Sequence, residues 1–296
     1  MKMKILQESL LSGNKIPKLG LGTWGIGGGP TKDLNNDDKG QVESIRYAVD
    51  SGFSFIRTAH NYAEGYCEEL VGKAIKGYDR KKLFLVSCAN QKFAVDKKSI
   101  IEVAKGSLKS LQTDYFDIFL IGAVNPNTSV KSILDGLVWL KEHGLTKDIG
   151  VSNYRLPELQ ASVDYLGKEL VYSEMHYNLI IREPEICGCL DYCREKGIIL
   201  SAYRPLQLGQ LSKSGIVLLD ELAKKYNKSQ SQISLKWLIQ KDGVTTMTKV
   251  INKKHIDEDL SVFDWELEKE DMEKLDKDFP VQIRISDCSE PRQFKF

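Results

Sequence analysis

The chain has 296 residues, a length that suits one large α/β core or two small domains. Its 42 Lys and Arg nearly balance its 41 Asp and Glu, so charge does not favour nucleic acid or an acidic membrane surface as a partner. The first residues lack the apolar run of a signal peptide, and no stretch approaches the ~20 apolar residues that span a bilayer. We therefore expect a cytoplasmic, monomeric protein whose partner is a small molecule.

The first elements in chain order are two short strands. Residues 4–9 and 15–19 flank Ser12, Gly13 and Asn14, a turn signal typical of a β-hairpin. The segment 19–24 has glycines where a neighbouring side chain or a ligand must approach the backbone closely. The Gly-rich tract 27–36 that follows is predicted to be loop.

From residue 38 onward, helical and strand patterns alternate. Apolar runs predict buried strands at 53–59, 83–88, 115–122, 148–153, 170–175, 198–205 and 245–250. Stretches with helical spacing lie at 38–51, 67–77, 97–111, 130–142, 156–166, 185–196, 214–226, 229–240 and 255–263. With 19–24 counted, about eight strands alternate with eight crossovers, which favours a closed (β/α)8 TIM barrel over an open sheet.

No linker-like segment interrupts this pattern, so we expect a single domain over residues 1–296. A further amphipathic helix is predicted at 264–277, followed by an irregular, charge-mixed tail at 279–296. A tail that follows the last helix of a barrel can fold over the mouth of the pocket.

The carboxyl ends of barrel strands carry function. The strand at 53–59 reaches Arg57, a polar loop carries Tyr62, and a helix begins near Tyr66, so we expect Arg57 and Tyr62 to lie at the site. The remaining strand ends are rich in polar or unusual residues for positions that point into a barrel mouth: Trp24, Cys88, Gly122, Ser152, Asn153, Glu174, Tyr203, Arg204 and Lys249.

Three roles are open to Arg57. Its planar guanidinium suits an anion clamp for a carboxylate or phosphate. It also suits a buried ion pair with an acid such as Glu174. Alternatively, its charge lowers the pKa of Tyr62 and so assists proton donation.

Cys88 has two interpretations. A neighbouring guanidinium lowers the pKa of a thiol, which would favour a reactive thiolate with His60 or His176 as its base. Buried cysteines are more often small apolar side chains.

Cys187, Cys189 and Cys193 fall within a predicted helix, where 189 and 193 share a face and 187 points elsewhere. No Cys-x-x-Cys pair is present, so core packing is a better interpretation than a metal cluster, and we predict no metal. The six cysteines of the chain do not form the pattern of a disulfide framework.

Seven short motifs, in order, make the sequence resemble the aldo-keto reductase family from about residue 5 to residue 277. They are LGLGTWG at 19–25, EELVGKAI at 68–75, LKSLQTDYFD at 108–117, IGVSNY at 149–154, YNLIIR at 177–182, AYRPL at 202–206 and DWEL at 264–267. The resemblance implies a (β/α)8 barrel with a hairpin across its bottom. It also implies an oxidoreductase that transfers hydride from NADP(H) to a carbonyl group.

The same resemblance points to an altered catalytic centre. The family uses a tyrosine as proton donor, a lysine paired with an aspartate, and a histidine that orients the carbonyl oxygen. Tyr62 matches the tyrosine, whereas Arg57, Cys88 and Gly122 stand at the aspartate, lysine and histidine positions. We therefore expect ordinary carbonyl reduction to be strongly impaired or altered, with Tyr62, Arg57 and Cys88 as the catalytic candidates.

The resemblance also implies a cofactor pocket. Ser152 and Asn153 match the pair that holds the nicotinamide carboxamide, and Tyr203 matches the residue that stacks on the ring. Lys249 matches the lysine that meets the 2′-phosphate of the adenosine, and Glu258 an adenine contact. The full set of predicted cofactor-binding residues is Trp24, Ser152, Asn153, Glu174, Tyr203, Leu206, Lys249 and Glu258.

Several of these positions predict weaker dinucleotide binding. Glu174 stands at the family's carboxamide glutamine, and an ionised carboxylate only accepts hydrogen bonds. Val250 removes a hydroxyl group, His255 stands at an arginine position, and Asp259 adds negative charge where a phosphate-bearing ligand would lie.

Three hypotheses follow. The first is an aldo-keto reductase fold with impaired NADP(H)-dependent reduction. The second is a non-catalytic protein that binds a small, anionic molecule. The third is a non-redox lyase or isomerase that uses Tyr62, Cys88 and Glu174.

Overall fold

A computed structural model describes residues 5–123, 129–249 and 252–288 of the chain. Its centre is a closed barrel of parallel strands in the order β10-β3-β4-β5-β6-β7-β8-β9, which confirms the predicted (β/α)8 architecture. The barrel strands are β3 (Leu19–Gly22), β4 (Phe55–Arg57), β5 (Phe84–Ala89), β6 (Phe116–Ile121), β7 (Thr146–Ser152), β8 (Leu170–His176), β9 (Ile199–Tyr203) and β10 (Val244–Lys249).

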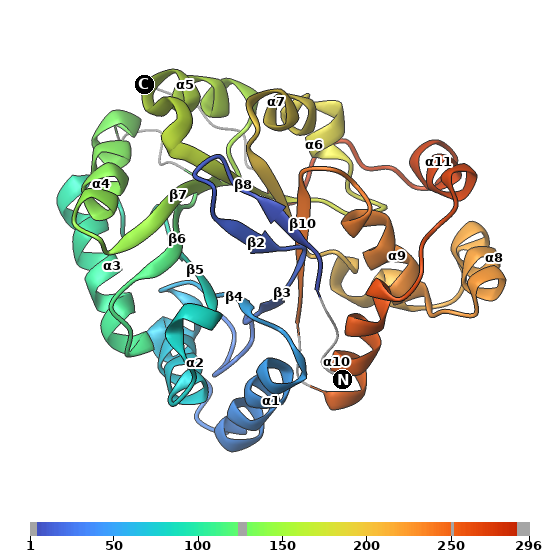
Figure 1. Cartoon of the computed structure of the whole chain (residues 1–296), viewed down its shortest axis with the longest axis horizontal. Helices are drawn as coiled ribbons and strands as arrows, with labels where there is room; N and C mark the ends of the chain where they lie inside the picture. Colours follow the sequence, from blue (N-terminus) through green and yellow to red (C-terminus); the bar gives the residue numbers. More distant parts are fainter. Residues whose placement is uncertain (1–4, 124–128, 250–251, 289–296) are drawn as a thin grey trace.

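Helices surround the barrel as an outer ring (Figure 1). Four of them have the predicted bounds: α1 (Asp38–Ser51), α3 (Lys97–Leu111), α4 (Val130–Glu142) and α5 (Leu156–Leu166). The others are α2 (Tyr66–Ile75), α6 (Glu183–Ile186), α7 (Cys189–Lys196), α8 (Val217–Tyr226), α9 (Gln230–Ile239), α10 (Lys253–Leu260) and α11 (Lys269–Lys277). Among the described residues, none of these helices is both long and apolar enough to cross a membrane.

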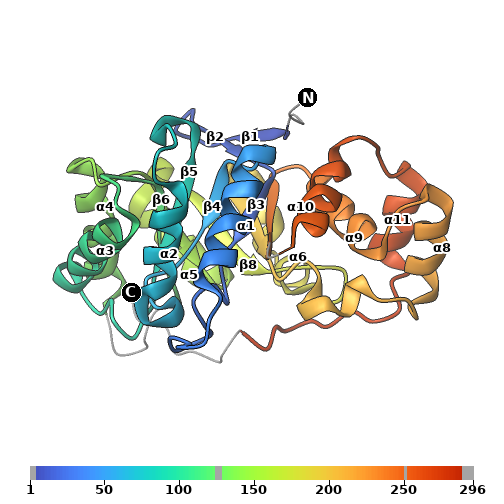
Figure 2. The same ribbon diagram turned by 90° about the horizontal axis from the view of Figure 1, so that it is seen from below.

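The predicted N-terminal hairpin is present but shorter, because β1 (Gln7–Ser9) and β2 (Lys15–Pro17) pair over only three residues each. Its turn is tied to the barrel, since the Ser12 hydroxyl and the Asn14 amide both donate to Asp148. Figure 2 shows the hairpin across one end of the barrel, while the segment that follows α11 runs along the opposite end.

Two predicted helices differ from the structure. The stretch 185–196 forms two helices, α6 and α7, because the chain turns at Gly188, whose φ is +79°. Only glycine adopts this conformation without strain. The stretch 264–277 becomes helical only at Lys269, and residues 264–268 precede the helix without regular secondary structure.

The barrel interior explains how the site is positioned. Apolar side chains fill its lower part, including two from the hairpin: Leu10, Ile16, Phe55, Phe84, Val86, Ile118, Leu120, Tyr172 and Ile199. Side chains of a strand alternate between its two faces, so the inward face continues from Phe55 to Arg57 and from Tyr172 to Glu174. Polar groups thus enter the barrel interior at the carboxyl ends of the strands.

The close approach predicted for the glycines of 19–24 is confirmed at Gly20. A Cβ atom there would lie 2.3 Å from Cδ1 of Phe55, far inside van der Waals contact. Any side chain at this position would displace Phe55, and with it the strand that carries Arg57.

Candidate active site

The polar centre of the barrel mouth is a buried ion pair between Arg57 and Glu174. Arg57 Nε donates to Glu174 Oε2 at 2.8 Å, and Nη2 donates to Oε1 at 2.5 Å. Both residues are almost fully buried, at 6% and 2% exposure. A planar guanidinium and a carboxylate form this two-point contact with high geometric specificity, so the pair fixes the orientation of both side chains.

The remaining Arg57 nitrogen joins this pair to Tyr62. Arg57 Nη1 donates to the carbonyl oxygen of Thr58 at 2.8 Å and to the hydroxyl oxygen of Tyr62 at 2.9 Å. Four of the five N–H donors of the guanidinium are therefore engaged within the protein. This confirms the ion-pair alternative for Arg57 and leaves too few donors for a two-point anion clamp.

Charge is retained at Arg57 despite its burial. Burial strongly disfavours the charged guanidinium, but Glu174, with smaller contributions from Tyr62 and Cys88, outweighs this effect and holds the pKa of Arg57 well above its ordinary value. The hydroxyl of Ser152 also donates to Glu174 Oε1, at 3.2 Å. The barrel mouth thus contains a permanent cation bridged to a carboxylate.

Tyr62 lies between this cation and the opening. Its ring packs edge-on against Trp24, with ring centroids 4.9 Å apart, and Trp24 itself is 44% exposed. Burial raises the pKa of Tyr62 to about 12, although the charge of Arg57 acts in the opposite direction. Arg57 therefore lowers the pKa of Tyr62, as hypothesised, but burial raises it by more, so the pKa lies above its ordinary value. At neutral pH, Tyr62 is a protonated phenol.

The same physical effect favours the other interpretation of Cys88, a buried apolar side chain, over the reactive thiolate. Burial raises the pKa of Cys88 to about 12, which outweighs the opposing effect of the Arg57 charge. Within the described residues, its Sγ makes no hydrogen bond to an imidazole and contacts the carbonyl oxygen of Ala89 at 3.6 Å. His60 is no better placed as a base, because burial lowers its pKa to about 4.

Gly122 keeps the space beside Cys88 open. A Cβ atom at Gly122 would lie 3.3 Å from the Ala89 carbonyl oxygen and 3.8 Å from Cys88 Sγ. A side chain at position 122 would therefore extend along the Cys88 side of the barrel mouth. Together, Cys88 and Gly122 leave this wall of the mouth without a charged group.

A second pair of predicted residues forms the opposite wall. The hydroxyl of Tyr203 donates to Oδ1 of Asn153 at 2.8 Å. Asn153 has a positive φ of +59°, and its backbone N–H donates to the Glu174 carbonyl oxygen at 2.8 Å. The ends of β7, β8 and β9 are thereby held together around the ion pair.

A family model described as the aldo/keto reductase family matches residues 18–278 of this sequence. The chain belongs to the aldo/keto reductase family. Among its curated relatives, glyoxal reductase of Bacillus subtilis is 32% identical over 90% of both chains. The methylglyoxal reductase YeaE of Escherichia coli is 29% identical over 95% of this chain and 96% of its own.

Solved structures of aldo-keto reductases share the fold. The thermostable aldo-keto reductase Tm1743, crystallised with the inhibitor epalrestat, superposes with a TM-score of 0.88 at 36% identity. That match covers 92% of this chain and 99% of the other. An aldo-keto reductase from Klebsiella pneumoniae in complex with NADPH gives a TM-score of 0.83 at 26% identity, over 94% and 96% of the two chains.

Other predicted residues of this aldo/keto reductase lie outside the Arg57 network. The ammonium group of Lys249 lies against the backbone of Gly25, where a Cβ atom would be 2.6 Å from its Nζ. Glu258, on α10, accepts a hydrogen bond from the hydroxyl of Ser229. Leu206 packs half-buried against the core. Lys249 is exposed.

The expected effect of Asp259 needs correction. Its carboxyl group is buried, at 5% exposure, and burial raises its pKa to about 7. It therefore carries only part of a negative charge at neutral pH and turns away from the surface. Val250, the other change predicted to weaken phosphate binding, lies outside the described residues, and His255 is exposed.

The described part of the C-terminal segment lies at the barrel mouth, as a tail after the last barrel helix can, but the sequence indicated none of its contacts. Ile283 pairs with Ile181 in a short bridge, and the carboxylate of Asp287 forms an ion pair with Arg204 at 3.2 Å. Residues 283–288 thus lie beside the ends of β8 and β9. Nothing in the irregular pattern of residues 279–296 indicates these contacts, because they depend on pairing with residues about a hundred positions earlier.

Proposed function

We propose that this chain is an NADP(H)-dependent reductase of small carbonyl compounds with a rebuilt and slow proton-donating centre. The observation that carries this proposal is the 2.9 Å hydrogen bond from Arg57 to the Tyr62 hydroxyl, backed by the Arg57–Glu174 ion pair. The resemblance gives the family's tyrosine a lysine and an aspartate as supports. Here Arg57 supplies the cation next to Tyr62, and Glu174 supplies the carboxylate that pairs with this cation.

Proton donation would proceed from Tyr62. When a carbonyl compound is reduced, the oxygen gains negative charge and must receive a proton. A protonated Tyr62 can donate that proton, and Arg57 stabilises the phenolate that remains. Because the guanidinium holds its own proton too tightly to relay one, Arg57 acts through its charge alone.

The high pKa of Tyr62 is the reason for a slow reaction. A phenol with a pKa of about 12 is a poor proton donor near pH 7, since general acids work best when their pKa lies near the operating pH. The wall of the barrel mouth formed by Cys88 and Gly122 supplies no group to orient the carbonyl oxygen of the substrate. General acid–base catalysis contributes typically 10²–10⁴-fold, so part of that factor is expected to be missing.

The residues fit the cofactor in part. Bound NADPH would supply the hydride. Lys249 is exposed beside the side-chain-free Gly25 and fits a phosphate group. Ser152, Asn153 and Tyr203 line the mouth where a carboxamide would lie, but Glu174 already accepts three hydrogen bonds from Arg57 and Ser152. We expect NADPH to bind, with lower affinity than in relatives that have an amide at this position.

Small dicarbonyl compounds are the first substrates to test, because two of the relatives are named glyoxal reductase and methylglyoxal reductase. The decisive experiment combines an NADPH fluorescence titration with the rate of NADPH oxidation in the presence of methylglyoxal. Saturable binding with slow oxidation that Tyr62→Phe abolishes supports the proposal. Turnover as fast as that of the relatives, or oxidation that persists in Tyr62→Phe, would contradict it.

The same experiment tests the two other hypotheses. A non-catalytic binding protein would bind NADPH and never oxidise it. The lyase or isomerase hypothesis requires a thiolate at Cys88, whereas burial raises the pKa of that thiol to about 12.

A further inference from the structure

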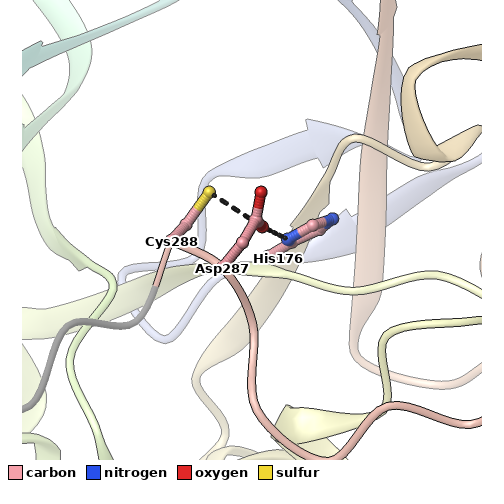
Figure 3. Close-up of side chains that lie close together, drawn as sticks. All are labelled: His176, Asp287 and Cys288. Carbon is pink, nitrogen blue, oxygen red and sulfur yellow. Dashed lines mark hydrogen bonds and ion pairs between the residues drawn. The ribbon is translucent and has the colours of Figure 1, made fainter.

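A cluster of side chains of the types that bind metals lies beside the barrel mouth, outside the Arg57 network (Figure 3). His176 comes from the end of β8, and Asp287 and Cys288 come from the C-terminal segment. His176 Nδ1 is 3.3 Å from Asp287 Oδ1, and Cys288 Sγ is 3.5 Å from the same oxygen. The three donor atoms all lie within 4.8 Å of one another.

The hydrogen bonds around Asn178 determine which atoms face His176. Asn178 Oδ1 accepts the backbone N–H groups of Ile180 at 2.9 Å and Ile181 at 2.8 Å. Its amide nitrogen must therefore be the atom that lies 2.9 Å from Gln207 Oε1. This contact requires an acceptor on Gln207, so the amide oxygen of Gln207 is the atom turned towards His176.

The tautomer of His176 follows. Its Nε2 lies 2.8 Å from Gln207 Oε1 and must carry the proton, because both atoms cannot be acceptors. Asn178 Nδ2 also lies 3.3 Å from His176 Nε2, but both nitrogens then carry hydrogen, so this contact is not a hydrogen bond. The lone pair is on Nδ1, where it now accepts the hydroxyl of Ser286 at 2.7 Å.

This arrangement is the one that metal-bound histidines have. Such residues donate their second ring N–H to an oxygen acceptor, which fixes the ring and leaves the other nitrogen free for the metal. Burial lowers the pKa of His176, which favours the neutral ring that a metal ligand requires. Its plane is also held by stacking on Tyr203, with centroids 5.3 Å apart and an angle of 19° between the planes.

Asp287 is oriented in a similar way. Arg204 Nη1 donates to both carboxylate oxygens of Asp287, at 3.2 Å to Oδ2 and 3.4 Å to Oδ1, and the Ser286 hydroxyl lies 3.4 Å from Oδ1. These contacts hold the carboxylate beside His176 and Cys288 (Figure 3). A tetrahedral zinc ion with bonds of about 2.0–2.3 Å holds neighbouring N, O and S ligands roughly 3.3–3.8 Å apart. The two separations that involve Asp287 Oδ1, 3.3 Å to His176 Nδ1 and 3.5 Å to Cys288 Sγ, fall in this range, and all three donor atoms lie within 4.8 Å of one another.

We propose that His176 Nδ1, Asp287 Oδ1 and Cys288 Sγ bind a zinc ion, with a fourth position open to water. Imidazole, thiolate and carboxylate together are the ligand set of zinc rather than of magnesium or calcium. On binding, the Cys288 thiol loses its proton to solvent and the Ser286 hydroxyl gives up its bond to Nδ1. Zinc would then fasten residues 286–288 to the end of β8.

The test is a titration of the reduced, full-length protein with cobalt(II), a spectroscopic substitute for zinc, followed by zinc calorimetry. One equivalent of cobalt should give tetrahedral d–d bands and a thiolate charge-transfer band, and zinc should displace it. Calorimetry in buffers of different ionisation enthalpy should detect the proton released by the thiol. Neither readout depends on reductase activity, so failure of the proposed function leaves this test intact.

Variants separate this site from the other cysteines. Cys288→Ser should abolish the charge-transfer band, and Asp287→Asn should weaken zinc binding at least about tenfold. Gln207→Leu, which removes the oxygen behind His176 Nε2, should weaken it by roughly 10–100-fold. The matched control is Cys187→Ser, because Cys187 and Cys189 are a second pair of thiols close together. A charge-transfer band that persists in Cys288→Ser, or that disappears in Cys187→Ser, would overturn the proposal, as would the absence of any band.

Discussion

Arg57 donates a 2.9 Å hydrogen bond to the hydroxyl of Tyr62, five residues further along the chain. The two residues come from the end of β4 and the turn after it, and Glu174 fixes the guanidinium from the opposite side of the barrel. A cation and a proton donor are therefore in direct contact at a site with no lysine or histidine at the positions the resemblance indicates.

The Arg57–Glu174 ion pair is expected to dominate the stability of the barrel mouth. Arg57→Met leaves a buried carboxylate without its partner and should lower the free energy of unfolding by about 3–5 kcal/mol. Replacing both residues with Met should recover most of this loss, because neither charge is then buried. Urea unfolding at pH 7 measures both effects.

The control is Lys277→Met, which removes an exposed ion pair with Glu273 and should leave stability nearly unchanged. If Arg57→Met and Lys277→Met lowered the free energy of unfolding equally, the prediction would be contradicted.

Tyr62→Phe separates proton donation from binding. The change removes the hydroxyl but keeps the ring against Trp24, so NADPH affinity should stay within about twofold. The kcat for methylglyoxal should fall about 10²-fold or more, since a general acid is lost. Single-turnover oxidation of NADPH measures the chemical step directly. A variant that keeps the wild-type rate would show that another group, or water, supplies the proton.

Restoring the family's residues should raise the rate. The combined variant Arg57→Asp, Cys88→Lys, Gly122→His and Glu174→Gln rebuilds the expected centre and should increase kcat/KM for methylglyoxal about 10²-fold. Arg57→Asp alone is the control: it places two carboxyl groups together and should destabilise the protein without any gain in rate. No increase in the combined variant, if its circular dichroism spectrum is native, would mean that these positions do not limit the reaction.

Cys88 should resist alkylation in the folded protein. Its thiol is buried and has a pKa of about 12, and the thiolate is the reactive form. Iodoacetamide labelling at pH 8, followed by mass spectrometry, should modify the partly exposed Cys288 well before Cys88. In denaturant the two should react at similar rates. Rapid native labelling of Cys88 would revive the nucleophile hypothesis.

Asp259 should make stability depend on pH. Burial raises its pKa from 3.8 to about 7, so between these values the folded state binds more protons than the unfolded state. The stabilisation is fully present below about pH 4 and is lost as pH rises through 7, by an amount on the order of 4 kcal/mol. Asp259→Asn should flatten this decline. Buried Glu68, whose pKa is also raised to about 7, should produce a remaining slope of the same sign.

The check is thermal or urea unfolding from pH 4 to pH 8 for the wild type, Asp259→Asn and the exposed control Asp114→Asn. The control should follow the wild type throughout. An unchanged slope in Asp259→Asn would mean that water reaches this carboxyl group and relieves the effect of burial.

The sequence by itself determined the barrel. Strand and helix periods, repeated about eight times, leave few other ways to bury the apolar faces, so four helices agree with the prediction to the residue. It also placed Arg57 and Tyr62 together, because a strand end and the turn after it are local features. The same local reasoning failed at Gly188, where one positive φ divides a predicted helix.

Only the tertiary structure decided which alternative holds at each site residue. Glu174, the partner of Arg57, is 117 positions away, and local pattern offered it only as one candidate. The pKa values of Tyr62 and Cys88 rise because burial outweighs the neighbouring charge, and burial is a property of the whole fold. The meeting of His176 with Asp287 and Cys288 likewise depends on long-range pairing at Ile283, which has no signal in the sequence.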